Sequence, residues 1–282
     1  MISRARRYRP VVVRTRLAGP AHGAEPVGGP SEPGGLPAKL ARGSATALLV
    51  YTAGAGLTYC AQLALTRTIG TSGYGVYAYV FAWVTVLAYA SALGFDVSLL
   101  RFVPAYLAPR AFDLLQGVVV YSRRRVAVVG CGIAFTGAVC TLILSGDLPP
   151  DLAGTFLVGF MVVPILALLW ISVAVVRGFG SVASALAPDR MVRDGVLLVL
   201  VLLATQVVGW RIDAPLAMVA TLLGSTAGLG LVSLGMRRLC PCDLNGVTPA
   251  YDVPTWRRTA LPLVVIGVAE ALMNRTGVLL LG

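Results

Sequence analysis

Three polar side chains interrupt the apolar stretch over residues 260–282: Glu270, Asn274 and Arg275. A charged side chain near the middle of a bilayer costs about 2.5–3.5 kcal/mol even on insertion scales, so such residues face a bundle interior or a wet cavity. Glu270 and Asn274 are four residues apart and share one face of a helix. One interpretation is a polar pathway in which Arg275 meets an anionic group and Glu270 a coupling cation. The alternative is that bundle neighbours neutralise Glu270 and Arg275, or that Arg275 extends outward to the interface.

Two further charges lie at the ends of apolar runs. Arg67 follows the first run, and Asp96 lies at the inner end of the second. Both positions favour interfacial side chains, and Arg67 is also a candidate for the polar pathway.

Other motifs give no catalytic or metal site. His22, the single histidine, lies in a Pro-, Gly- and Arg-rich tail, so no Ser/His/Asp or Cys/His set can form among the apolar runs. Cys240 and Cys242 could supply half of a structural zinc site, which needs four ligands, but no second pair lies nearby. We therefore expect no enzyme activity, no metal and no cofactor.

These residues must be positioned by helices within a membrane. Of the 282 residues, 57% are hydrophobic and only 12% are charged, and the mean hydropathy is +0.83. Soluble domains are nearer a quarter charged, and about 20 helical residues cross a bilayer. Seven apolar runs reach or approach that length: 44–64, 75–95, 126–145, 152–176, about 192–210, 214–236 and 260–282. They predict an all-α, polytopic transmembrane bundle of about seven spans.

The basic residues predict the orientation. The net charge is +11, and 20 of the basic residues fall in the tail before the first run or in the links after the second, fourth and sixth runs. That distribution places the amino terminus in the cytoplasm by the positive-inside rule. It also argues against a nucleic-acid partner, because the charge flanks membrane spans instead of forming one basic face. Met191–Asp194, at the weak fifth run, are expected at the membrane surface, with Arg193 counted in the cytoplasmic link.

The chain divides into three parts by composition. Residues 1–43 read as a disordered basic cytoplasmic tail, 44–258 as a six-helix transmembrane lobe, and 259–282 as a seventh transmembrane helix. The link 101–125 fits an amphipathic helix on the cytoplasmic surface. The small residues of Gly224-Ser-Thr-Ala-Gly228 would let the sixth run approach a neighbouring helix closely.

Three patches resemble a known family. They are Ile69-Gly70 through Tyr74-Gly75 and Tyr77, then Gly94 with Arg101, and finally Ala271–Gly282. Together they resemble bacterial polysaccharide-biosynthesis flippases, the O-antigen and teichoic-acid exporters of the multidrug/oligosaccharidyl-lipid/polysaccharide exporter superfamily. Where family members commonly carry an Asp before the final Leu-Gly, this chain has Gly277.

The resemblance implies a transporter in the bacterial inner membrane. It would move an isoprenoid-diphosphate-linked glycan between leaflets by alternating access, with H⁺ or Na⁺ as a possible coupling ion and membrane lipid as surroundings. The family has 12 to 14 helices in two lobes, so the chain looks truncated after the first lobe and one further helix. Three alternatives stay open: a cation-coupled multidrug exporter with Glu270 as the coupling carboxylate, a membrane-embedded enzyme of polysaccharide assembly, and a non-transporting membrane scaffold. Short outer links and scattered Asp residues argue against the enzyme.

Overall fold

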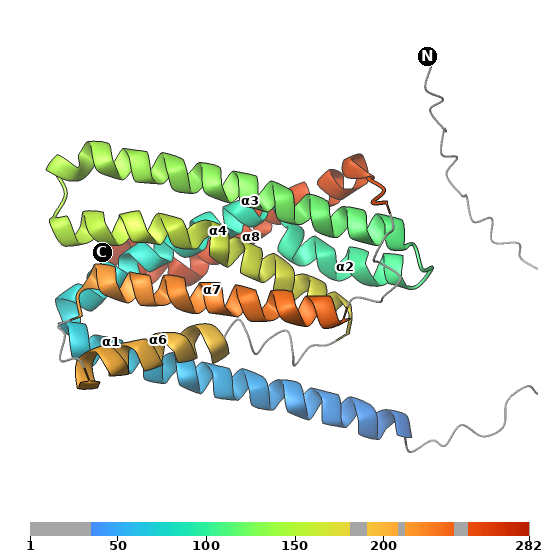
Figure 1. The fold of residues 1–282 in the computed structure, drawn as a ribbon, viewed down its shortest axis with the longest axis horizontal. Helices are drawn as coiled ribbons and strands as arrows, with labels where there is room; N and C mark the ends of the chain where they lie inside the picture. Colours follow the sequence, from blue (N-terminus) through green and yellow to red (C-terminus); the bar gives the residue numbers. More distant parts are fainter. Residues whose placement is uncertain (1–34, 181–190, 208–211, 240–247, 282) are drawn as a thin grey trace, which may run out of the picture. The chain divides into compact units, whose positions relative to one another are not determined.

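The computed structural model describes residues 35–180, 191–207, 212–239 and 248–281 (Figure 1). Residues 1–41 and 42–282 form separate compact units. Of the tail predicted as disordered over residues 1–43, residues 1–34 lie outside the described residues, whereas residues 35–43 are helical, which corrects that prediction for them. Every described element of the second unit is helical, without a strand among those residues. The all-α prediction is therefore confirmed for the described part of the chain.

The first two apolar runs lie in one helix, α1 (Gly35–Ala92), which is broken at Gly70. Gly70 has φ 80° and ψ 171°, a backbone conformation that side-chain-bearing residues rarely adopt. The two halves of α1 run in opposite directions on either side of this break (Figure 1). The sequence places the break correctly, because runs 44–64 and 75–95 end and begin on either side of Gly70.

Helices α2 (Phe95–Leu107) and α3 (Phe112–Ile143) form an antiparallel pair joined by a short turn. This pair corrects the interpretation of 101–125 as a helix lying along the membrane surface. Leu99 and Val103 of α2 and Leu115 and Val118 of α3 are fully buried or nearly so. Their burial in the bundle stabilises the hairpin more than a half-solvated surface position would, because it removes more apolar area from water.

Helix α4 (Pro150–Gly178) forms the centre of the bundle, between α3 and α7 (Figure 1). A 3-10 turn (Leu144–Gly146) connects it to α3. Pro150 occupies the first helical position, where its missing N–H leaves no hydrogen bond unmade. Six consecutive residues from Ile171 to Val176 are buried, so this part of α4 is covered on all sides, as expected for a helix surrounded by others.

Three helices follow. Helix α6 (Arg193–Leu202) continues into a π-helical segment (Leu203–Val207) and packs against α7 (Ala214–Leu239). Helix α8 (Val253–Leu281) contains the candidate residues from the sequence and is mostly exposed along its length.

Five helical stretches are long and apolar enough to cross a membrane. They are Leu48–Leu107, Phe112–Gly146, Pro150–Gly178, Ala214–Arg238 and Val253–Leu280. The first contains both halves of α1, and the helical stretch through α6 is too short in its described part to be counted among the five. The described helices thus have the composition of a multi-pass membrane protein.

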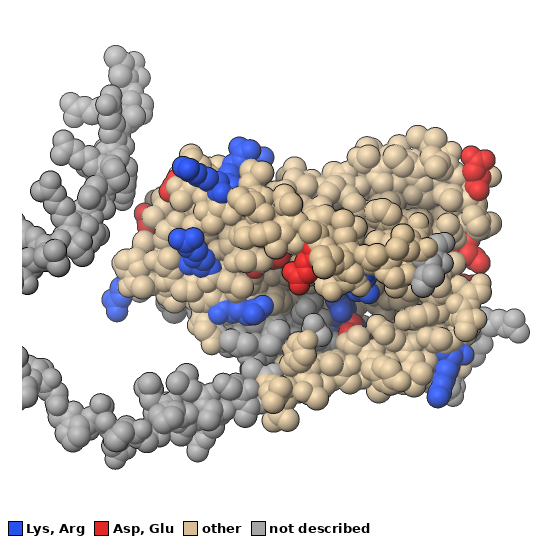
Figure 2. Space-filling view, turned by 180° about the vertical axis from the view of Figure 1, so that it is seen from behind, with Lys and Arg blue, Asp and Glu red and all other residues tan. Residues whose placement is uncertain are grey.

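The basic side chains gather at one end of the bundle. From α2 on, consecutive helices alternate in direction (Figure 1), so the α2–α3, α4–α6 and α7–α8 connections share one end and the α3–α4 and α6–α7 connections the other. The first end carries Arg101, Arg110, Arg123, Arg124, Arg125, Arg177, Arg237, Arg238, Arg257 and Arg258. The second end carries Asp147, Asp151 and Asp213, together with Arg67. Figure 2 shows that most of the basic side chains gather toward one end. This is the alternation that the sequence predicts for these residues.

Candidate functional site

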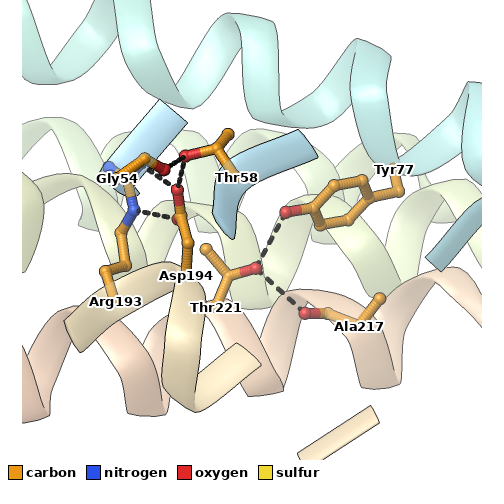
Figure 3. Close-up of polar contacts among 7 residues, drawn as sticks. All are labelled: Gly54, Thr58, Tyr77, Arg193, Asp194, Ala217 and Thr221. Carbon is orange, nitrogen blue, oxygen red and sulfur yellow. Dashed lines mark hydrogen bonds and ion pairs between the residues drawn. The ribbon is translucent and has the colours of Figure 1, made fainter. Parts of the chain in front are cut away.

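A buried ion pair lies at the start of α6. The Nε of Arg193 donates to Oδ1 of Asp194 over 2.8 Å, and Asp194 is only 7% exposed. The hydroxyl of Thr58, on the first half of α1, donates to the other carboxylate oxygen of Asp194, and the Gly54 carbonyl oxygen, 3.0 Å away, is a second acceptor within its reach (Figure 3). The pair thus links α6 to α1.

This ion pair lies beside the middle of α7. A Cβ built on Gly224 would stand 2.5 Å from the carbonyl oxygen of Arg193, so the absence of a side chain at Gly224 permits the contact. Gly224 is near the midpoint of α7. The expected close approach of the small-residue motif is confirmed at this glycine.

The depth of Arg193 and Asp194 corrects the sequence interpretation. The sequence predicts Met191–Asp194 at the membrane surface and counts Arg193 in a cytoplasmic link. The structure instead packs them against mid-α7, and the physical reason is mutual neutralisation. Two opposite charges in hydrogen-bonding contact lose much less on leaving water than either would alone.

A second polar contact crosses the bundle next to this pair. The Tyr77 hydroxyl, on the second half of α1, lies 2.9 Å from the Thr221 hydroxyl of α7. Thr221 donates its single hydrogen to the Ala217 carbonyl over 3.0 Å, so its oxygen accepts from Tyr77 (Figure 3). Both side chains are buried.

Two adjoining cavities surround these contacts. The first, of about 320 Å³, is lined by the ion pair, Thr58, Tyr77, Thr221 and Arg275, among others. The second, of about 330 Å³, is lined by Thr58, Arg193, Asn274 and Arg275, with Trp170 and Tyr89. Since Arg193 and Arg275 line both, the cavities form one polar region among α1, α6, α7 and α8.

Aromatic rings form one wall of this region. Tyr74, Tyr77 and Phe81 recur at three- and four-residue intervals on the second half of α1 and line the first cavity, and the rings of Tyr77 and Phe81 are stacked with centroids 5.9 Å apart. The guanidinium carbon of Arg275 lies 5.5 Å from the Phe81 ring centroid. A cation over an aromatic face is worth about 0.5–2 kcal/mol depending on desolvation, which offsets part of the cost of Arg275 at this depth.

Of the four site residues predicted from the sequence, two line the cavities and two do not. Asn274 and Arg275 line the cavities. Glu270 is exposed and lines neither, and Arg67 is exposed three residues before the α1 break. The structure therefore brings together two of the four.

Sequence reasoning missed the polar residues contributed by other helices. These residues lie in or beside separate apolar runs, and only the folded structure brings them to one cavity: Thr58, Tyr77, Asp194 and Thr221. Asp194 alone had a usable signal, because it is an acidic residue directly before the apolar stretch that begins at Gly195.

No metal-binding cluster of His, Cys, Asp and Glu occurs among the described residues. Cys240 and Cys242 lie outside them. Among the residues that line the two cavities, the charged side chains are Arg193, Asp194 and Arg275. The region carries one net positive charge and is suited to an anionic ligand.

Comparison with protein-family models, with curated proteins and with solved structures gave no match.

Proposed function

We propose that the chain is part of a transporter for an anionic, lipid-linked oligosaccharide in the bacterial inner membrane. Its spans would number about seven, with the amino terminus in the cytoplasm, as the positive-inside distribution favours. The ligand would be an isoprenoid diphosphate bearing a glycan.

The observation that carries the proposal is the cationic cavity. Arg193 is paired with Asp194, whereas Arg275 makes a cation–π contact with Phe81 and has no ion pair with a carboxylate among the described residues. A diphosphate entering the cavity would supply the charge-assisted hydrogen bonds that a guanidinium makes best in bidentate form. The aromatic wall offers flat faces against which the C–H groups of a sugar ring can pack.

The roles proposed for the remaining candidates follow from their positions. Asn274 adds an amide to the same cavity. Coupling by H⁺ or Na⁺ is assigned to Asp194 in preference to Glu270, because Asp194 is the carboxylate that lines the cavity. The second candidate function is a cation-coupled multidrug exporter. It is favoured by Asp194, a carboxylate that could bind the coupling cation, and by the aromatic rings that line the same cavity.

Ligand binding to the purified full chain tests the proposal. Native mass spectrometry with a short isoprenoid diphosphate should show binding that Arg275→Gln weakens at least tenfold. Arg238→Gln, an exposed arginine at the basic end, is the matched control and should bind as the wild type does. Equal binding by wild type and Arg275→Gln, or equal binding of an uncharged isoprenol, would refute the proposed site.

A flipping assay separates transport from binding. The chain is reconstituted in vesicles that contain a fluorescent isoprenoid-diphosphate sugar, and the label in the outer leaflet is bleached with a membrane-impermeant reductant. Faster loss of the protected label than in protein-free vesicles is the expected result. Binding without flipping would favour the non-transporting scaffold.

A further inference from the structure

A separate cavity opens between α3 and α8, toward the basic end of the bundle. It has a volume of about 200 Å³ and is lined by Tyr121, Arg125 and Val129 of α3 and by Arg257, Leu261 and Val264 of α8, among others. Leu93 and Phe95, at the junction of α1 and α2, complete its lining. None of these residues lines the polar cavities described above.

The two helices present the same polarity gradient to this cavity. On α3, Tyr121, Arg125 and Val129 follow one another at four-residue spacing and share one face. On α8, Arg257 precedes Leu261 and Val264 on the way into the bundle. Because both helices enter from the basic end, each wall changes from a guanidinium to aliphatic side chains with increasing depth.

The position of the arginines matches the edge of the hydrocarbon. Helix α3 has 32 residues and, at about 1.5 Å per residue, is about 48 Å long, so an upright α3 would extend roughly 18 Å beyond a hydrocarbon layer of about 30 Å. Arg125 is the fourteenth residue of α3, about 20 Å from its start. If the far end of α3 is level with the opposite edge of the hydrocarbon, the whole excess lies at the basic end, and Arg125 is close to the level at which phospholipid phosphates meet the acyl chains.

The two arginines are available to an anion. Both are exposed, and neither forms an ion pair with a carboxylate within the described part of the chain. Arg125 is held over the Tyr121 ring, with its guanidinium carbon 5.5 Å from the ring centroid. This contact orients the guanidinium and leaves its N–H groups able to donate.

We propose that this cavity binds one anionic glycerophospholipid of the cytoplasmic leaflet. Its phosphate would accept hydrogen bonds from Arg125 and Arg257, and the upper part of an acyl chain would pack against Val129, Leu261 and Val264. A free phosphate would use only the outer half of the cavity, so the aliphatic depth favours a lipid. The inference does not depend on the chain being a transporter.

Lipid titration of the full chain tests this site. Native mass spectrometry in detergent, with phosphatidylglycerol and phosphatidylcholine as separate probes, should show at least a tenfold preference for phosphatidylglycerol. The double variant Arg125→Gln/Arg257→Gln should lose that preference. Arg124→Gln/Arg258→Gln removes the same charge from neighbouring exposed positions that do not line the cavity, and it should keep the preference.

Two further arms separate the site from its alternatives. Arg125→Lys/Arg257→Lys keeps both charges and should retain a preference between those of wild type and the double Gln variant, which a misfolded protein would not do. Soluble glycerol phosphate should not displace the lipid at equal concentration. Three results would each overturn the proposal. The first is a wild-type preference for phosphatidylglycerol in the Arg125→Gln/Arg257→Gln variant, and the second is an equal loss of that preference in the two double Gln variants. The third is displacement of the lipid by glycerol phosphate.

Discussion

Two glycines of α7 should respond to the same substitution with opposite signs. Gly224 faces the backbone of Arg193, and Gly230, six residues further along, has nothing within 4 Å of a Cβ built on it. Replacing each with Ala adds one methyl group to the same helix. The two variants therefore differ only in what the methyl group meets.

The magnitudes follow from the geometry. Ala is favoured over Gly in a helix interior by about 0.5–1 kcal/mol, so Gly230→Ala should raise the free energy of unfolding by roughly that amount. At Gly224 the new Cβ would lie 2.5 Å from the Arg193 carbonyl oxygen and 3.3 Å from its carbonyl carbon. Both are backbone atoms, and moving them shifts the start of α6, so an overpacking cost of about 1–3 kcal/mol outweighs the gain in helix propensity.

Thermal unfolding in detergent, followed by tryptophan fluorescence, measures the difference. Gly224→Ala should unfold below the wild type and Gly230→Ala at or above it. Both variants gain the same helix propensity, so they should be separated by the overpacking cost alone, about 1–3 kcal/mol. Gly224→Ala should also move the start of α6 away from the first half of α1. A Thr58→Cys/Asp194→Cys pair, at two positions in contact in the wild type, should then form a disulfide more slowly. A Gly224→Ala variant as stable as Gly230→Ala would refute the close packing of α6 on α7.

Two further substitutions test hydrogen bonds that connect distant segments. Asp194→Asn removes the charge that makes the hydrogen bond from Arg193 charge-assisted, and such a bond is worth about 1.5–3 kcal/mol, so the variant should unfold more easily in detergent. Asp213→Asn, at an exposed position, is the control and should change the free energy of unfolding by less than about 0.5 kcal/mol. Equal effects of the two substitutions would contradict the pairing. Tyr106→Phe keeps the phenyl ring but removes the hydroxyl that accepts the 3.0 Å hydrogen bond from the indole nitrogen of buried Trp256, so it should cost about 1–3 kcal/mol. Exposed Tyr59→Phe is its control in the same unfolding experiment, and an equal loss there would remove the hydrogen bond as the cause.

Several elements could be read from the sequence because the bilayer fixes their length. The predicted run 214–236 corresponds to α7 (Ala214–Leu239), and 152–176 corresponds to α4 (Pro150–Gly178). Hydropathy locates these helices because crossing a hydrocarbon layer of about 30 Å takes about 20 predominantly apolar helical residues. The prediction for the segment 101–125 was wrong, because its interleaved charged and apolar residues fit a surface helix and a packed hairpin equally well.

The candidate site was only half predictable, and Asp194 shows why. A hydropathy window scores each charge singly, so an acidic residue at the edge of an apolar run is assigned to the interface. Whether the charge can lie deeper depends on a partner and on a space for it. Arg193 is adjacent in sequence, but the space comes from Gly224, which is 30 residues away.

The placement of Arg275 bears directly on the two interpretations of the polar helix. Neutralisation by bundle neighbours would need an opposite charge beside Glu270 and beside Arg275. The two residues point about 140° apart around the helix axis, and neither forms an ion pair within the described part of the chain. The structure leaves Glu270 exposed outside the cavities and directs Arg275 into them, over Phe81. The nearest cavity carboxylate, Asp194, is already hydrogen-bonded to Arg193 and Thr58. Under the proposed function, the guanidinium of Arg275 is therefore the cation that an incoming anion would meet, and this is the interpretation that the Arg275→Gln binding experiment tests.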